Sequence, residues 1–278
     1  MRITSWNLLH GLSVPPANGP AVEAAAELAS RLAGSVKALE ADVLAVQEVD
    51  YFLERSGNLN QVAQAAAAMG AKDWAFAPSV IGSPDGDWKA PGRDHKSVVT
   101  DADLKADSAY GIGLISKLPV ESWHRLNLRP SPVGVFMAFP VDGKFKKIYI
   151  RDHPRSAIAC VLENGWLIVN THLSFVPIFN IAQLLKIKRW IKRLPVKEKQ
   201  KIILMGDLNL PWVSVVKGIN WNSLARQKTY PSWNPKWQLD YILSQKVASE
   251  DVVHTTLTHA QVDRISDHLP LSIEVDVD

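Results

Sequence analysis

The segment Lys201-Ile-Ile-Leu-Met-Gly-Asp-Leu-Asn-Leu210 joins a run typical of a buried β-strand to polar residues that the interior of a sheet does not need. The apolar run over 201–205 predicts a short strand, and Asp207 and Asn209 follow directly after it. An Asx turn is one interpretation of these two residues, because Asp and Asn side chains bond to their own backbone. A functional site is the other, since carboxylate and amide oxygens are the ligands that Mg²⁺ takes.

The same arrangement recurs at the ends of other β-prone runs. The residues concerned are Asn7, Glu48, His172, Asp240, Asp267 and His268. Each has an ordinary interpretation alone: a surface acid at a strand end, a turn acid, or a satisfied histidine at a sheet edge. Together they supply oxygen ligands for a hard cation and two histidines for proton transfer near neutral pH. The pattern therefore indicates a metal-assisted site with acid–base chemistry.

Helices and strands are expected around these residues, with no linker that would divide the chain. Amphipathic or alanine-rich stretches predict helices at 23–39, 60–69 and 180–194. β-prone runs predict strands at 3–9, 42–49, 111–116, 156–162, 165–171, 201–205, 239–244 and 271–275. The polar stretch 78–107 is expected to be a long loop, either shaping the substrate site or simply irregular. Residues 1–278 are predicted to form a single domain.

The composition excludes several classes of protein. Of the 278 residues, 47% are hydrophobic and 21% charged, which rules out a disordered chain, a coiled coil and a collagen-like rod. The lone Cys160 cannot form an internal disulfide or a cysteine-based zinc site, and a buried thiol is expected. The net charge of +3 permits a phosphate-bearing partner without requiring one. No apolar run is long enough for a membrane span and no signal peptide precedes the first strand, so a cytoplasmic monomer is expected.

Short motifs in a fixed order carry a family resemblance. They are Trp6-Asn7, Val46-Gln-Glu-Val49, Asn170-Thr-His-Leu173, Met205-Gly-Asp-Leu-Asn-Leu210, Leu239-Asp-Tyr-Ile-Leu243 and Ser266-Asp-His-Leu-Pro270. In this order they resemble the endonuclease/exonuclease/phosphatase superfamily, which has the deoxyribonuclease I-like fold. The resemblance covers nearly the whole chain. It implies an α/β (α+β) fold, a four-layer αββα sandwich of two β-sheets packed face to face with helices outside and the active site at one end.

The resemblance also implies a metal site. Glu48 is similar to the principal Mg²⁺ ligand, with Asn7 beside it and Asp267 completing the site directly or through water; Mn²⁺ is expected to substitute for Mg²⁺. Asp207 and Asn209 resemble the pair that orients the attacking water and the phosphoryl oxygens, and they are candidates for holding a second metal.

Two histidines complete the implied machinery. His268 resembles the histidine at the phosphate, and a hydrogen bond from its ring to Asp240 would fix the ring and favour its charged form. His172 resembles the other catalytic histidine, a donor toward the phosphate or the leaving group. The implied reaction is single-step hydrolysis of a phosphate ester by an activated water. Which histidine is the general acid stays open.

The substrate is less determined. Abasic-site endonucleases of this superfamily characteristically have Asn in place of His172 and often an acidic residue where this chain has Leu9, so the resemblance argues against such a repair enzyme. Arg155 resembles an arginine near the substrate phosphate, with an exposed strand-end arginine as the alternative. Trp212 is expected to line the pocket, where it would stack on a base or pack against a lipid.

Three functions remain open. The first is a phosphodiesterase with endonuclease-like activity on DNA or RNA, which would use the weak basicity and the aromatic side chains. The second is a phospholipid (sphingomyelinase-like) or inositol phosphate hydrolase. The apolar run Phe175-Val-Pro-Ile-Phe179 would suit a lipid-facing role, although packing against the following helix is expected. The third is a catalytically weak binding member.

Two sets of side chains bear on this choice. The basic residues of 186–201 are expected to form a solvated outer face directed away from the catalytic end, with a nucleic-acid surface as the alternative. Of the ten tryptophans, Trp6, Trp166 and Trp190 are expected in the core. Those crowded between the Asn209 and Asp240 motifs are expected in loops near the active end: Trp212, Trp221, Trp233 and Trp237.

Overall fold

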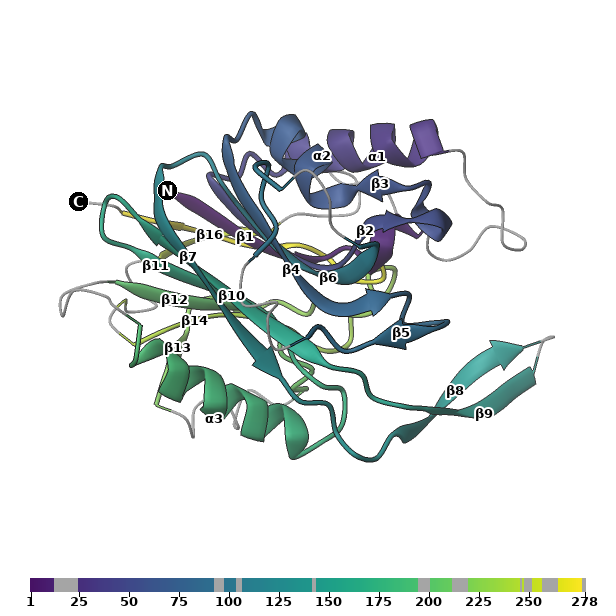
Figure 1. The fold of residues 1–278 in the computed structure, drawn as a ribbon. Coiled ribbons are helices and arrows are strands. Elements are labelled where there is room, and N and C mark those ends of the chain that lie inside the picture. The colour runs from purple at the N-terminus through teal and green to yellow at the C-terminus, as the bar shows by residue number, and fades with distance from the viewer. Residues whose placement is uncertain are drawn as a thin grey trace.

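Two mixed β-sheets pack face to face in the computed structural model, with helices on both outer faces (Figure 1). The structure describes residues 1–12, 25–92, 98–103, 107–141, 144–194, 201–211, 220–245, 247, 252–256 and 265–276. The four-layer sandwich implied by the motifs is confirmed.

The first sheet has eight strands, with β1 and β2 parallel to each other near its centre. In spatial order they are β15 (Val252–Thr256), β16 (Leu271–Val275), β1 (Arg2–Asn7), β2 (Val43–Leu53), β6 (Ala109–Ser116), β4 (Asp73–Gly82) and β5 (Trp88–Lys89), with β3 (Leu59–Asn60) paired to β2. α1 (Ala25–Ala38) and α2 (Gln61–Met69) cover its outer face (Figure 1).

The second sheet has six strands and carries α3 (Phe179–Ile191) on its outer face (Figure 1). In spatial order the strands are β13 (Asn222–Ser223), β14 (Asp240–Ser244), β12 (Ile202–Asp207), β11 (Leu167–His172), β10 (Arg155–Leu162) and β7 (Val120–Leu128). β11 and β12 are parallel. Two short 3₁₀ turns, η1 (Leu9–Gly11) and η2 (Glu54–Ser56), follow β1 and β2.

The inner faces of the two sheets form the central core. Cys160 lies fully buried in it, as expected, and burial raises the pKa of its thiol. One polar link crosses the core: Gln47 Nε2 donates to Asn170 Oδ1 at 2.7 Å. Asn170 in turn donates to the backbone carbonyls of Val46 and Gly113, so this amide of β11 is bonded to two strands of the opposite sheet. A buried polar group has to be bonded, so these links fix how the sheets face each other.

Several strands were not expected from the sequence. β4 extends into the stretch 78–107 as far as Gly82 and pairs with β5, so the first part of the expected long loop is a strand pair. Pro78 obscures this strand in the sequence, but it lies where the pairing with β6 shifts register, a position at which a missing N–H is tolerated. β7 is a half-buried edge strand. β8 (Val135–Val141) and β9 (Lys144–Ile150) form a separate two-stranded hairpin.

No helix among the described residues is both long and apolar enough to span a bilayer.

Candidate active site

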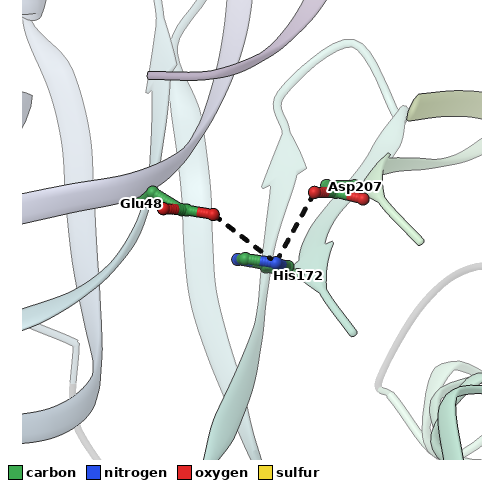
Figure 2. Close-up of side chains that lie close together, drawn as sticks. All are labelled: Glu48, His172 and Asp207. Carbon is green, nitrogen blue, oxygen red and sulfur yellow. Dashed lines mark ion pairs between the residues drawn. The ribbon is translucent and has the colours of Figure 1, made fainter. Parts of the chain in front are cut away.

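The strand-end residues singled out in the sequence converge at one edge of the sandwich. β11 and β12 run parallel with His172 beside Asp207, and antiparallel pairing of β12 with β14 sets Asp207 opposite Asp240. Glu48 comes from the facing sheet, and Figure 2 shows Glu48 and Asp207 on either side of the His172 ring. His172 Nε2 lies 3.9 Å from Glu48 Oε1 and 3.5 Å from Asp207 Oδ2.

Glu48 is directed into the site by a β-bulge. The pairing of β2 with β6 shifts register between Gln47 and Val49, and the intervening Glu48 has a φ of 54°. An extra residue in one strand re-aims its side chain and bends the strand. The adjoining Asn7 then ties both sheets together: its Nδ2 donates to Glu48 Oε1 at 2.9 Å and to Asp207 Oδ2 at 3.0 Å.

Gly206 allows Asp207 to reach the site. Its φ is 138°, and a Cβ at this position would collide with the backbone carbonyl oxygen of Thr171 on β11. Beyond it, Asp207 Oδ1 accepts a hydrogen bond from the Asn209 backbone N–H at 2.9 Å, which is the Asx turn considered above. The turn also directs the Asn209 amide to the site, where Nδ2 lies 3.2 Å from His172 Nε2. The Asx turn is therefore confirmed, and it is compatible with the interpretation of this motif as a functional site.

His268 is held by a buried acid. Its Nδ1 lies 2.8 Å from Asp240 Oδ2, which also accepts a hydrogen bond from the Thr229 hydroxyl at 2.5 Å. Burial acts to lower the pKa of His268, but the nearby charges of Asp240, Asp207 and Asp267 raise it to about 10. The ring is therefore a cation at neutral pH, and its Nε2 lies 3.8 Å from Asp207 Oδ2.

The loop that carries His268 is anchored to β1. Trp6 Nε1 donates to the His268 carbonyl at 2.9 Å, and the Ser266 hydroxyl donates to the Asn7 carbonyl at 2.5 Å. The Ser266 hydroxyl also accepts from the His268 backbone N–H. Trp6 thus belongs to the core, as expected, and positions the site as well.

His172 is the uncharged histidine of the pair. Burial, reinforced by the positive charges of Arg155 and His268, lowers its pKa well below the usual value. Because a neutral ring has one N–H and one acceptor nitrogen, Nε2 accepts from the Asn209 amide when Nδ1 carries the proton.

The acids at this edge outnumber their cationic partners. Asp267 Oδ1 is buried and has no hydrogen-bond partner among the described residues, and burial raises the pKa of Asp267 to about 6. Burial likewise raises the pKa of Asp207. Glu48, Asp207 and His172 offer ligand atoms within 4.8 Å of one another. An unpartnered carboxylate oxygen among further carboxylates fits a divalent cation, and oxygen-rich donor sets favour hard ions such as Mg²⁺ or Mn²⁺.

Arg155 begins β10 and is buried, so it is not the exposed strand-end arginine considered as an alternative. Its Nη2 lies 3.5 Å from Asp152 Oδ1, and its guanidinium lies over the Phe175 ring at 5.6 Å. Nε and Nη1 have no hydrogen-bond partner among the described residues, and Arg155 lines the same cavity as His172. Buried guanidinium N–H groups without a partner favour an anionic ligand.

A cavity of about 740 Å³ is lined by Glu48, His172, Asp207, Asn209 and His268. Phe175, Pro177 and Ile178 line it together with Trp237. The expectation that 175–179 packs against the following helix is wrong for Pro177 and Ile178, which are exposed, Ile178 by 75%, whereas Val176 is buried. Helix packing uses α3 side chains further along, such as Leu184 and Ile187.

The tryptophans and the basic helix are placed differently. Trp221 is buried against the second sheet rather than lining the site, whereas Trp233 and Trp237 are exposed. Trp212 lies outside the described residues. α3 contributes only Asn180 and Ile181 to the cavity, so the described basic residues of this helix do not line it.

Some residues at the site were not given a role from the sequence. Thr229, which donates to Asp240, lies just before the stretch 230–235 that resembles a site-shaping loop, and the Tyr230 ring lies 5.0 Å from the His268 ring. His10 and Arg55 line the wall nearest Glu48. The Pro-rich stretch 230–235 is a sequence signal for the part of the site around Thr229 and Tyr230. No neighbouring residues indicate a role for His10 or Arg55.

The chain belongs to the Endonuclease/Exonuclease/phosphatase family, whose model matches residues 4–268. No curated protein matches its sequence.

Solved structures share the fold at low identity. The human Nocturnin catalytic domain with a bound sulfate anion is 20% identical, with a TM-score of 0.56 over 98% of this chain and 93% of that one. A mannosyl-6-phosphatase from Bacteroides thetaiotaomicron is 16% identical, with a TM-score of 0.55 over 99% and 98%. A 3′ phosphatase from Neisseria bound to a product DNA hairpin is 16% identical, with a TM-score of 0.52 over 99% of each chain.

Proposed function

We propose that this chain hydrolyses phosphate esters with a divalent cation, Mg²⁺ being the expected ion and Mn²⁺ a substitute. The observation that carries the proposal is the cluster of Glu48, Asp207 and His172, whose ligand atoms lie within 4.8 Å of one another. The buried Asp267 Oδ1 has no hydrogen-bond partner among the described residues and lies 4.0 Å from His268 Nε2. Glu48, Asn7 and Asp267 would hold the metal, with Asp207 and Asn209 as candidates for a second. When bound, the ion supplies Lewis-acid polarisation of a phosphoryl oxygen.

The residues of the chain divide the remaining work. Asp207 and Asn209 orient the attacking water, and Asp207 accepts its proton as the new P–O bond forms. His268, fixed through Asp240, presents Nε2–H to the phosphoryl or leaving oxygen, which takes up a proton as the ester P–O bond breaks. His172 positions Asn209, and Arg155 offers its free N–H groups to the substrate anion.

A phosphodiester of a nucleic acid is the first candidate substrate. The exposed Trp237, whose ring stacks with Tyr230 at a centroid distance of 6.2 Å, would hold a base by stacking. The second candidate is a phosphate ester with a large apolar part, such as a phospholipid. The apolar wall of Phe175, Pro177 and Ile178 favours this second candidate, because a highly charged inositol phosphate or a nucleic-acid backbone gains nothing from it.

The test compares Asp207→Ala and His268→Ala with Glu163→Gln, an exposed acid at the far end of β10. Hydrolysis of bis(p-nitrophenyl) phosphate with Mg²⁺ should be abolished in the first two variants and unchanged in the third, with far-UV circular dichroism confirming folding. Retained hydrolysis in both alanine variants would refute the site. Plasmid DNA, phospholipid and inositol phosphate, each assayed with Mg²⁺ and with EDTA, would separate the candidate substrates.

A further inference from the structure

The β8–β9 hairpin has no role in the proposed chemistry. Its strands pair only with each other among the described residues, and Figure 1 shows the hairpin projecting beyond the edge of the sandwich. An isolated two-stranded hairpin is at best marginally stable in water, so a projecting one gains stability from whatever covers it.

Apolar side chains are exposed on both faces of this hairpin. Phe136 is 71% exposed and pairs with Tyr149, which is 48% exposed, with ring centroids 5.2 Å apart. Ile148 directly precedes Tyr149 in β9 and therefore points to the opposite face, where it is 41% exposed. Val133, just before β8, is 53% exposed. Clustered exposed apolar groups of this kind mark an interaction surface.

Basic residues predominate in the hairpin: the sequence 133–151 contains four of them and one acid, Asp142. The sequences of β8 and β9 contain no Asp or Glu, whereas Lys146 and Lys147 are exposed on β9 and Arg151 is exposed directly after it. Apolar side chains interspersed with cations are complementary to an anionic lipid membrane, which has negatively charged head groups above an apolar interior.

The hairpin leads into the catalytic cavity. Ile150, the last residue of β9, and Arg151 line the cavity, as do the exposed apolar residues Pro177 and Ile178. A surface that covered the hairpin would therefore meet the cavity at residues suited to an acyl chain or lipid backbone.

We propose that the β8–β9 hairpin docks this protein onto anionic lipid membranes and delivers lipid phosphate esters to the cavity. The delivery of lipid phosphate esters to the cavity rests on the proposed function. The docking of the hairpin onto a membrane does not depend on it. Nucleic acid fits less well, because Ile148 and Val133 have no ring to stack on a base and no charge for a phosphate.

Co-sedimentation with vesicles tests the docking. The wild-type chain should bind vesicles of phosphatidylcholine mixed with phosphatidylserine, more weakly at high salt, and bind pure phosphatidylcholine far less. The double variant Phe136→Ser/Ile148→Ser should bind the mixed vesicles about tenfold more weakly or worse, because two apolar side chains no longer insert. Lys147→Glu should weaken binding to the mixed vesicles alone. Leu185→Ser, at a residue 39% exposed on α3, is the matched control and should bind like wild type.

Several results would overturn the proposal. Wild-type protein that leaves mixed vesicles unbound, or a double variant that binds as wild type does, removes the docking surface. A second outcome would also overturn it: the wild-type chain does not bind vesicles but instead forms a dimer, measured by light scattering, or binds single-stranded DNA. If the double variant abolishes that dimer or that DNA complex, the hairpin is an interface for another partner. Hydrolysis of bis(p-nitrophenyl) phosphate should be equal in all variants. If the wild-type chain binds mixed vesicles but does not hydrolyse bis(p-nitrophenyl) phosphate, the catalytic proposal is refuted and the docking proposal stands.

Discussion

His268 Nδ1 lies 2.8 Å from Asp240 Oδ2, and both side chains are buried. The carboxylate fixes the orientation of the ring, so that Nε2 faces Asp207, and it counteracts the effect of burial on the imidazolium. This pair therefore sets both the direction and the charge of the histidine at the site.

Replacing Asp240 with Asn should remove both effects. We expect kcat for a soluble phosphodiester to fall by about 10²–10⁴-fold, the range for a displaced acid–base group. Because Asp240 helps to raise the pKa of His268 to about 10, that pKa should fall in the variant, and the alkaline limb of the pH–rate profile should move to lower pH. Glu121→Gln, at an exposed residue near the start of β7, is the control, and an unmoved alkaline limb would contradict the assignment.

Mg²⁺ should stabilise the folded chain through Asp267. A ligand that binds only the native state stabilises it by RT ln(1 + [L]/Kd), so Tm rises with the concentration of the ligand. In Asp267→Asn the Mg²⁺ dependence of Tm should shift to concentrations about tenfold higher or more, a loss that even outer partners of metal sites produce. Calorimetric titration gives the same affinity directly. Equal curves for wild type and variant would remove Asp267 from the metal site, and Glu163→Gln should match wild type.

Gly206→Ala should be strongly destabilising. The added Cβ would meet the Thr171 carbonyl at a φ of 138°, a conformation open essentially to glycine. We expect a loss of about 3 kcal/mol or more in the free energy of unfolding, measured with urea. Gly34→Ala is the matched control: it lies in α1 with no atom near the new Cβ, so it should be neutral or stabilise by about 0.5–1 kcal/mol. Similar losses in both variants would contradict the collision.

His153 should make stability depend on pH below neutrality. Burial and the charge of Arg155 lower its pKa to about 3, although a hydrogen bond to the Pro154 carbonyl acts the other way. Below about pH 6.5 the unfolded chain binds a proton that the folded chain does not, so stability falls as pH drops toward 3. In EDTA, His153→Gln should flatten this dependence by up to about 1.4 kcal/mol per pH unit. An unchanged slope would show that His153 is charged in the fold.

The sequence predicted the strand ends well because their signals are local. An apolar run followed by Asp207 and Asn209 identifies both a strand and its chemistry within ten residues. The αββα layering and the convergence of His172, Asp240 and His268 followed from the order of the motifs.

Features set by distant packing were missed. β4 contains Pro78 and reads as a loop until its pairing partner β6 is known. The exposure of Ile178 and the burial of Trp221 both depend on where α3 packs, and the neighbouring sequence does not predict that position. Thr229 donates a hydrogen bond to Asp240, and this contact forms only because the fold brings the two residues together across a loop.

The bulge at Glu48 separates the fold from its chemistry. Because this residue is the one left out of the pairing between β2 and β6, a deletion of this single residue would leave two strands able to form an uninterrupted ladder. The sandwich would survive such a deletion with its core intact, while the carboxylate would be gone. Within this architecture, catalysis can thus be lost in one genetic step that leaves a folded protein behind, free to be retained for binding alone.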